Sequence, residues 1–310
     1  MGKIRELKAE HYAAIHAEYI KWLNTLGFAK CTVTNFDRAM KDFFEWLENR
    51  NILSITQLTN KHISDYYEHM QTRPNRKYTY RAGISATQIN QNTDAINKLC
   101  EFLYQNGMNN APIPPNFRIK IDEHTRIRKL QPFTQEEIKE LYGCIDLTYN
   151  NLKYETRELK QEQIRLVFAL HYGCGLRMSE GQKLTIQDVD FEKKTVFVRQ
   201  GKNYKDRIVP MNDGVCKIVE NYIYNYRKCY KTAGNRLFIN KQMSLMRGLK
   251  ELQRVCDNPQ IKEKRLYFHI LRHSIATHLL QNGMKIENIA LFLGHSTLES
   301  TQIYTHLINI

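Results

Sequence analysis

The sequence predicts a mainly α-helical protein of two domains, with a small antiparallel β-sheet in the second domain. Apolar residues recur at intervals of three and four along most of the chain, a spacing typical of amphipathic helices. A proline-rich stretch at 111–115 interrupts this pattern, and two short β-type runs, 195–199 and 207–211, stand among the later helices. A length of 310 residues also favours two domains over one.

The first third of the chain is expected to form a bundle of four helices. The first helix ends at Gly27, where a left-handed C-cap is expected. A second and a third helix follow at about residues 36–47 and 61–69. Ser85 is placed to cap a fourth helix, which closes at Gly107.

Residues 111–133 are interpreted as an extended linker between a domain at 1–110 and a domain at 134–310. Two adjacent prolines in this stretch each remove a backbone donor, so a helix cannot continue through them. Thr134 is expected to cap the next helix, with Glu137 completing a capping box.

The charge balance points to a polyanionic partner. Lys and Arg exceed Asp and Glu by 46 to 32, which gives a formal net charge of +14. Nucleic acid is therefore the leading partner class, and a protein that is basic for other reasons is the alternative. Seven scattered cysteines without a CxxC pair favour neither a disulfide framework nor a zinc ribbon. Without a secretory or spanning apolar run, a cytoplasmic protein that does not act at a membrane is expected.

The candidate chemistry lies in five short motifs of the second half of the chain. A pair of histidines four residues apart, as in HILRH, is one arrangement that binds zinc. No glutamate stands between them as in HExxH, and no third ligand is evident, so no metal site is predicted. In chain order the motifs are GCGLRMSE at 173–180, GKNYKDRIVP at 201–210, HILRH at 269–273, LGHS at 293–296 and Tyr304.

Taken together and in this order, the motifs resemble those of the tyrosine recombinase (phage integrase) family, which includes chromosome-dimer resolvases and the integrases of mobile elements. The resemblance covers nearly the whole chain. It implies an N-terminal helical core-binding domain of the SAM-like type and, from about residue 130, a mostly helical catalytic domain. It also implies site-specific DNA recombination through a 3′-phosphotyrosine intermediate, without a cofactor.

The resemblance gives each motif a role when it is carried over residue by residue. The two arginines would hold the scissile phosphate, the lysine would protonate the leaving 5′-oxygen, and the tyrosine would be the nucleophile, supported by two histidines. Elementary chemistry agrees, because guanidinium forks suit the charge that develops on two phosphate oxygens, and a phenol and a 5′-oxygen both need proton transfer. The implied catalytic set is Arg177, Lys202, His269, Arg272, His295 and Tyr304.

Other side chains in the motifs are expected to support this set. Glu180 lies one helical turn after Arg177 and is placed to orient its guanidinium or a histidine; a surface carboxylate is the alternative. His273 resembles a family position that supports the site from behind. Lys205 competes with Lys202 for the role of acid. Lys202 is preferred because it directly follows Gly201 at the end of the first strand, a position that resembles that of the family's catalytic lysine.

Basic side chains outside the motifs are expected to contact DNA, as the two domains close around a duplex. The alternative for those in the linker is solvated charge in a flexible strap. The expected partners are double-stranded DNA with inverted half-sites and a homotetramer of this chain on paired sites; an accessory DNA-bending protein is left open as a further partner. The predicted DNA contacts are Arg73, Arg76, Lys77, Arg81, Arg126, Arg128 and Lys129.

Two other functions stay open at this point. A type IB topoisomerase would share the chemistry but return each strand to its own end. A DNA-binding regulator that has lost catalysis is the second alternative, and it is disfavoured because a protein that only binds has no physical need for the nucleophile Tyr304.

Overall fold

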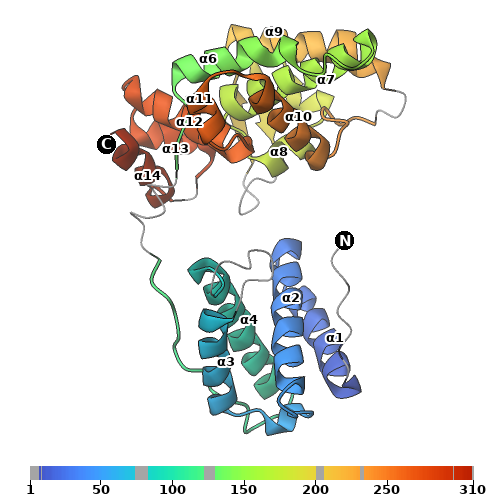
Figure 1. Ribbon diagram of the computed structural model, residues 1–310, viewed down its shortest axis with the longest axis vertical. Coiled ribbons are helices and arrows are strands. Elements are labelled where there is room, and N and C mark those ends of the chain that lie inside the picture. Colours follow the sequence, from blue (N-terminus) through green and yellow to red (C-terminus); the bar gives the residue numbers. More distant parts are fainter. Residues whose placement is uncertain are drawn as a thin grey trace. The chain divides into compact units, whose positions relative to one another are not determined.

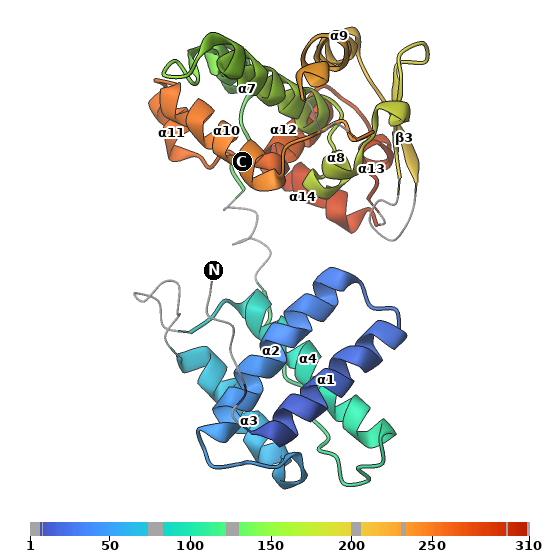
Figure 2. The ribbon, with the colours of Figure 1, turned by 90° about the vertical axis from the view of Figure 1, so that its right-hand side faces the viewer.

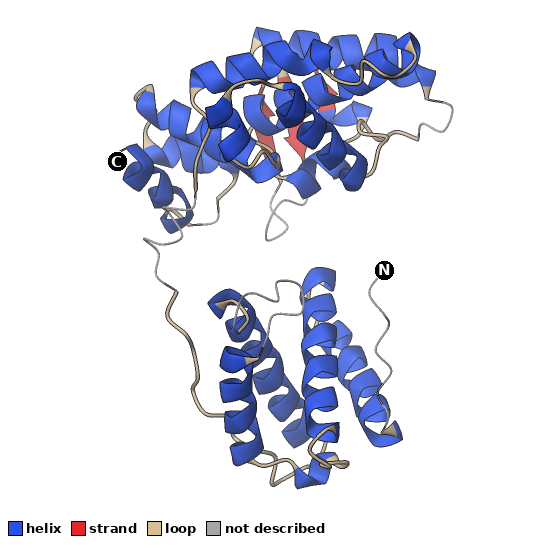
Figure 3. Cartoon of the chain, in the orientation of Figure 1, coloured by secondary structure: helices blue, strands red, loops and turns tan. Residues whose placement is uncertain are grey.

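The chain divides into two compact units, Met1–Asp122 and Glu123–Ile310 (Figure 1). Both units are mainly helical, and within the described residues strands occur in the second unit only (Figure 3), which confirms the predicted fold class. The structure, a computed structural model, describes residues 7, 9–73, 83–121, 130–199, 206–230, 234–295 and 297–308, with side chains up to Thr305 in the last range.

The first unit is the four-helix bundle that the sequence predicts. Gly27 has a φ of +74°, which confirms the left-handed C-cap of the first helix. The Ser85 side chain accepts a hydrogen bond from the Gln88 amide and so caps the fourth helix as expected. Its elements are α1 (Glu10–Thr25), α2 (Lys30–Glu48), η1 (Ile55–Gln57), α3 (Asn60–Thr72) and α4 (Ala86–Gln105).

The segment that follows α4 packs on this same bundle. The buried side chain of Asn90 donates to the Ile119 carbonyl and accepts from the Ile119 amide, each at 2.9 Å. The ring of Phe117 stacks on Tyr67, with 4.8 Å between centroids. The first half of the predicted linker is therefore held against α4, because a side-chain amide offers the same donor and acceptor as a neighbouring strand.

The second unit places a small sheet among helices. Its helices are α6 (Gln135–Gly143), α7 (Tyr154–Val167), α8 (Met178–Lys183), α9 (Asp213–Asn221), α10 (Gln242–Val255), α11 (Pro259–Glu263), α12 (Phe268–Gln281), α13 (Ile286–Leu293) and α14 (Glu299–Ile308). Short 3₁₀ or π segments are η2 (Cys144–Leu147), η3 (Phe168–Gly173), η4 (Ile186–Asp188), η6 (Tyr222–Tyr226) and η7 (Arg227–Cys229).

The sheet is antiparallel, in the order β1 (Val189–Asp190), β2 (Thr195–Val198) and β3 (Arg207–Pro210). Strands β2 and β3 are the two predicted β-type runs. Val198 pairs with Arg207, the last pair before the turn that joins these strands. Strand β1 was not predicted, because two residues are too few to show an alternating pattern. Figure 2 shows β3 at the side of the unit where α8 and α13 also lie.

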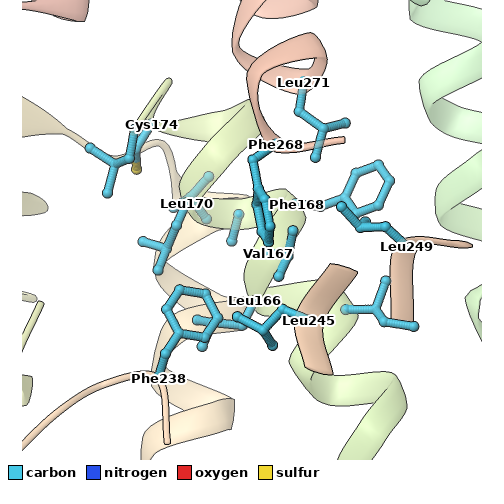
Figure 4. Packing of buried hydrophobic residues seen from close by; sticks show 14 of the residues in the cluster. Leu166, Val167, Phe168, Leu170, Cys174, Phe238, Leu245, Leu249, Phe268 and Leu271 are labelled. Carbon is cyan, nitrogen blue, oxygen red and sulfur yellow. The ribbon is translucent and has the colours of Figure 1, made fainter. Parts of the chain in front are cut away.

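The core of the second unit surrounds η3, a π-helical continuation of α7. Figure 4 shows Phe168 and Leu170 of this segment among Phe238 and residues of α10 and α12, such as Leu249 and Phe268. Short π-helical segments are rare and often occur at functional sites. Because η3 ends at the first glycine of the GCGLRMSE motif, core packing fixes where that motif begins.

The end of the predicted linker belongs to this core. The Phe133 amide donates to Ser274 Oγ, and the Phe133 carbonyl accepts from His278 Nε2, each at 2.9 Å. Thr134 and Glu137 then form the predicted capping box of α6, with bonds of 2.7 and 3.2 Å between amides and side chains. Both contacts to Phe133 come from α12, so this helix fixes the point at which the chain enters the second unit.

None of the described helices has the length and apolar content needed to cross a membrane.

The Asn90 contact predicts a local change in Asn90→Ala. Removal of the amide leaves the Ile119 amide and carbonyl unpaired, so this segment should open more readily. We expect hydrogen exchange of the Ile119 amide to become about tenfold to a hundredfold faster. The control is Gln91→Ala, which truncates an exposed neighbour on α4 and should leave this exchange rate unchanged. Equal exchange in both variants would contradict the inferred role of Asn90.

Candidate active site

Arg177 stands at the N-terminus of α8 and is fixed by Glu180 and Gly294. The Arg177 backbone amide donates to Glu180 Oε2 at 2.8 Å, and its Nη1 donates to Glu180 Oε1 at 2.7 Å. Its Nη2 donates to the Gly294 carbonyl at 3.0 Å. Glu180 is only 4% exposed, so it is not a surface carboxylate. One buried carboxylate thus orients both the backbone and the guanidinium of Arg177.

Arg207, at the start of β3, is a second partner of Glu180. Its Nη1 and Nη2 donate to the two carboxylate oxygens at 2.9 and 2.8 Å, a bidentate pair. Burial alone would raise the pKa of Glu180. The hydrogen bonds and charge of Arg207, followed by those of Arg177, outweigh burial and lower this pKa to about 2.

Sequence reasoning did not single out Arg207, although it lies in the GKNYKDRIVP motif. The available signal is its position at the first residue of a predicted strand, where a long basic side chain is unusual among β-type neighbours.

Arg272 lies on α12 with its side chain almost completely buried. Its Nη1 donates to the Gly175 carbonyl at 2.6 Å and its Nη2 to the Leu293 carbonyl at 2.7 Å. The same Nη1 is 3.9 Å from Glu180 Oε2. Burial, followed by the charge of Arg177, lowers the pKa of Arg272. Three guanidiniums therefore surround one carboxylate, and this excess of positive charge favours an anion.

The end of α13 brings two of the arginines together. Gly294 adopts a left-handed conformation with a φ of +64° and ends the helix. The carbonyls of Leu293 and Gly294 accept from Arg272 and Arg177, respectively. Cations are stabilised at a helix C-terminus, where carbonyls lack helical partners. His295 follows directly, and its Nδ1 lies 2.7 Å from Thr301 Oγ1 in α14.

Tyr304 lies on α14 and is 1% exposed. Its hydroxyl is 3.0 Å from Nδ1 of His273, and its ring is nearly parallel to that of His295 at a centroid distance of 6.4 Å. Burial raises the pKa of Tyr304 to about 12, against the opposing charges of Arg272 and Arg177. The phenol is therefore protonated at neutral pH, and its hydroxyl lies within hydrogen-bonding distance of His273 Nδ1.

His269 is exposed in the first turn of α12, one turn before Arg272 and His273. Partial desolvation, followed by the charges of Arg272 and Arg177, lowers the pKa of His269. Its imidazole is therefore biased toward the neutral form, in which it can accept a proton.

His171, which the sequence did not single out, lies beneath the first motif in η3. Its Nδ1 is 2.9 Å from the Leu176 carbonyl, directly before Arg177. Burial lowers the pKa of His171 to about 4, so it is neutral, and the carbonyl requires that Nδ1 carries the hydrogen. A Cβ added at Gly181 would lie within 2.9 Å of the ring, which shows how closely α8 packs on this histidine.

Several predicted residues are not placed. Among the predicted DNA contacts, Arg73 is described, with its side chain 15% exposed and its Nη2 3.2 Å from Asp42 Oδ2. The two candidate acids and the other predicted DNA contacts lie outside the described residues: Lys202, Lys205, Arg76, Lys77, Arg81, Arg126, Arg128 and Lys129. In the part of the chain that is described, no group of three or more His, Cys, Asp or Glu residues is arranged to hold a metal ion.

Residues 132–309, more than half of the chain, match the phage integrase family. The chain belongs to this family of tyrosine recombinases. It is 28% identical to the tyrosine recombinase XerD of Halalkalibacterium halodurans over 288 residues, which cover 91% of this chain and 88% of that protein. It is 33% identical to a tyrosine recombinase of Thermosipho africanus over 224 residues, which cover 71% and 72% of the two chains.

Solved structures share the fold of this tyrosine recombinase. The XerH site-specific recombinase, bound to its difH substrate, superposes with a TM-score of 0.68 and 19% identity, covering 95% of this chain and 80% of that one. The Tn1549 transposon integrase gives a TM-score of 0.63 and 17% identity, with 94% of each chain covered. These comparisons favour site-specific recombination over the topoisomerase-like and regulatory alternatives.

The charge on Glu180 predicts a pH-dependent loss of stability in Glu180→Gln. The folded pKa of Glu180 lies below the unfolded value, so its contribution is present above about pH 5 and is lost as the pH falls toward 2. At pH 7 the variant should lose on the order of 3 kcal/mol of unfolding free energy. The difference should shrink as the pH is lowered to 4, measured by urea unfolding and circular dichroism.

The matched control is Glu192→Gln, an exposed carboxylate in the β1–β2 turn, which should have little effect at either pH. A stability difference for Glu180→Gln that stays constant from pH 7 to pH 4 would show that the ionised carboxylate is not what the site requires.

Proposed function

We propose that this recombinase cleaves and rejoins duplex DNA through a 3′-phosphotyrosine intermediate at Tyr304. The observation that carries the proposal is the position of a buried tyrosine within the electrostatic influence of Arg177 and Arg272, beside His273. A phenol can attack a phosphodiester when the developing charge is held by fixed guanidiniums and the phenolic proton has an acceptor.

In the cleavage step, Tyr304 Oη bonds to phosphorus and the bond between phosphorus and the 5′-oxygen breaks. The phenolic proton passes to Nδ1 of His273, and the ammonium of Lys202 gives a proton to the leaving 5′-oxygen. Arg177 and Arg272 hold the two non-bridging oxygens. Rejoining reverses the step, with a 5′-hydroxyl of the second duplex as the nucleophile, so the phosphodiester energy is conserved and no nucleotide is consumed.

The buried tyrosine must become accessible before it can react. With 1% exposure and a pKa raised to about 12, Tyr304 is a weak nucleophile in the described arrangement. DNA binding must therefore shift α14 or the residues around it. The same burial prevents Tyr304 from attacking a wrong phosphate before Arg177 and Arg272 have bound the scissile one.

The partners we propose are double-stranded DNA with inverted half-sites and a homotetramer on two paired sites; an accessory DNA-bending protein stays open as a further partner. A net charge of +14 supports a polyanionic partner. One solved XerH complex contains a palindromic difH substrate, and the Tn1549 integrase is solved with transposon DNA, which supports this kind of site.

Tyr304→Phe should abolish covalent attachment, because it removes only the nucleophilic oxygen. The probe is a duplex selected from a random-sequence library by its binding to Tyr304→Phe. The cleaved strand of this duplex is then nicked at successive positions, so that the short fragment between the cleavage position and the nick diffuses away. With label at the 5′ end of the cleaved strand, the unsubstituted protein should retain label on a denaturing gel.

Tyr224→Phe, which alters an exposed tyrosine, is the matched control and should form the adduct normally. Label retained by Tyr304→Phe would place the nucleophile elsewhere, and retention only of 3′ label would reverse the polarity of the linkage.

The choice of Lys202 over Lys205 as the acid predicts a specific rescue. A sulfur in place of the 5′-bridging oxygen leaves readily without a proton. Lys202→Ala should cleave the ordinary duplex about 10²–10⁴-fold more slowly and recover most of its rate on the sulfur-bridged duplex. Rescue of Lys205→Ala in its place would reverse the assignment, and rescue of neither would put the acid outside this turn.

A further inference from the structure

We propose that Arg207 is a positioning residue for the recombination reaction, which fixes Arg177 by holding both groups that bind the Arg177 guanidinium. The inference rests on the proposed function, since it assigns Arg177 to the scissile phosphate. It adds a third arginine to the site. Arg207 lies at the start of β3 and is not among the catalytic residues that the motif resemblance implies.

The first group that Arg207 holds is the carboxylate of Glu180. Both oxygens of Glu180 accept from Arg207, at 2.9 and 2.8 Å, and both also accept from Arg177, at 2.7 and 2.8 Å. A carboxylate with a bidentate partner on one side has little freedom to rotate. Arg207 therefore determines the direction in which Glu180 presents its remaining lone pairs to Arg177.

The second group is the backbone of Gly294, whose carbonyl accepts from Arg177 Nη2 at 3.0 Å. A Cβ added at Gly294 would lie 2.8 Å from both Cδ and Nη1 of Arg207, so the arginine side chain packs directly on this turn. His295 is the next residue in the chain. Through these two contacts, Arg207 joins β3 to α8 and to the end of α13.

The burial of Arg207 favours a role in the site over a role in stability alone. Its side chain is 11% exposed, and its Nε is buried without a hydrogen-bond partner in the described part of the structure. Glu180 already has Arg177 as a partner, so a second buried guanidinium adds a desolvation cost and an unpaired donor. Such a cost is expected where geometry serves a function.

Arg207 acts through Arg177 because both of its Nη groups are bound to Glu180. It also lies at the mouth of the β2–β3 turn, opposite Val198, and the sequence places Lys202 within that turn. An effect through the lysine is therefore the competing route. The contacts favour Arg177, because Arg207 touches both described acceptors of the Arg177 guanidinium, Glu180 and Gly294.

The test compares Arg207→Lys and Arg207→Ala with a matched variant, Arg199→Ala. Arg199 follows β2 in the same hairpin and also binds a buried carboxylate, with its Nε 2.7 Å from Asp188 Oδ1. Its loss therefore controls for removal of an arginine–carboxylate pair from the hairpin. Arg207→Lys keeps a positive charge beside Glu180 and loses only the planar fork, so it tests geometry even where Arg207→Ala fails to fold.

Adduct formation is measured in single turnovers on the selected, nicked duplex in three forms. The first has the ordinary phosphate, the second has sulfur at the 5′-bridging position, and the third has a methylphosphonate at the scissile position. The methylphosphonate lacks the charge of one non-bridging oxygen, so a well-placed arginine is worth less on it. The sulfur substrate removes only the need for an acid.

On the ordinary phosphate, both Arg207 variants should form the adduct about 10-fold to 10²-fold more slowly than the unsubstituted protein, with DNA affinity unchanged. Sulfur should not restore the rate. The methylphosphonate should bring the variants close to the unsubstituted protein, in the same pattern as Arg177→Ala. Arg199→Ala should match the unsubstituted protein on all three substrates.

Rescue of the Arg207 variants by sulfur would overturn the proposal, because the residue would then act through the leaving-group acid. Rates equal to those of Arg199→Ala on every substrate would overturn it as well. Failure of the unsubstituted protein to form an adduct with any nicked duplex would instead count against the proposed function, which keeps the two results separate.

Discussion

The buried carboxylate of Glu180 is the group on which the geometry of the site depends. An ionised carboxylate at 4% exposure requires charged partners, because its desolvation would otherwise raise its pKa and neutralise it. Those partners, Arg177 and Arg207, come from the N-terminus of α8 and the start of β3. Their side chains in turn reach Gly294 at the end of α13. Three segments that are distant in the sequence are thus fixed by one negative charge.

Helix α12 supplies the second constraint. One part of the helix carries Arg272 and His273, which contact the end of α13 and Tyr304. The next residue, Ser274, and His278, one turn later, hold both backbone groups of Phe133 at the entry to the second unit. Because a helix is stiff over this length, the entry of the chain and the surroundings of Tyr304 are fixed relative to each other.

Much of the fold could be predicted because its signals are local. Helical periodicity and the caps at Gly27, Ser85 and Thr134 depend on residues within one or two turns of each other, and the structure reproduces them. Contacts between distant segments left no such signal. The hold of Asn90 on Ile119 and the choice of His273 as the described hydrogen-bond partner of the Tyr304 hydroxyl depend on tertiary packing. The resemblance of the motifs to the family identified the predicted site residues, but it gave no reason to select Arg207.

The electrostatics of the site explain why a phosphate would be bound where the motifs converge. Burial and the neighbouring Arg177 already disfavour the charged form of Arg272, so the folded protein carries a cost that an anion would remove. A phosphate between the arginines would therefore improve the interactions of the site as well as its own. Because Arg177, Arg207 and Arg272 all lie close to Glu180, the loss of any one changes the surroundings of the others. Their contributions to stability and to reaction must for that reason be strongly non-additive, and the cluster acts as one unit.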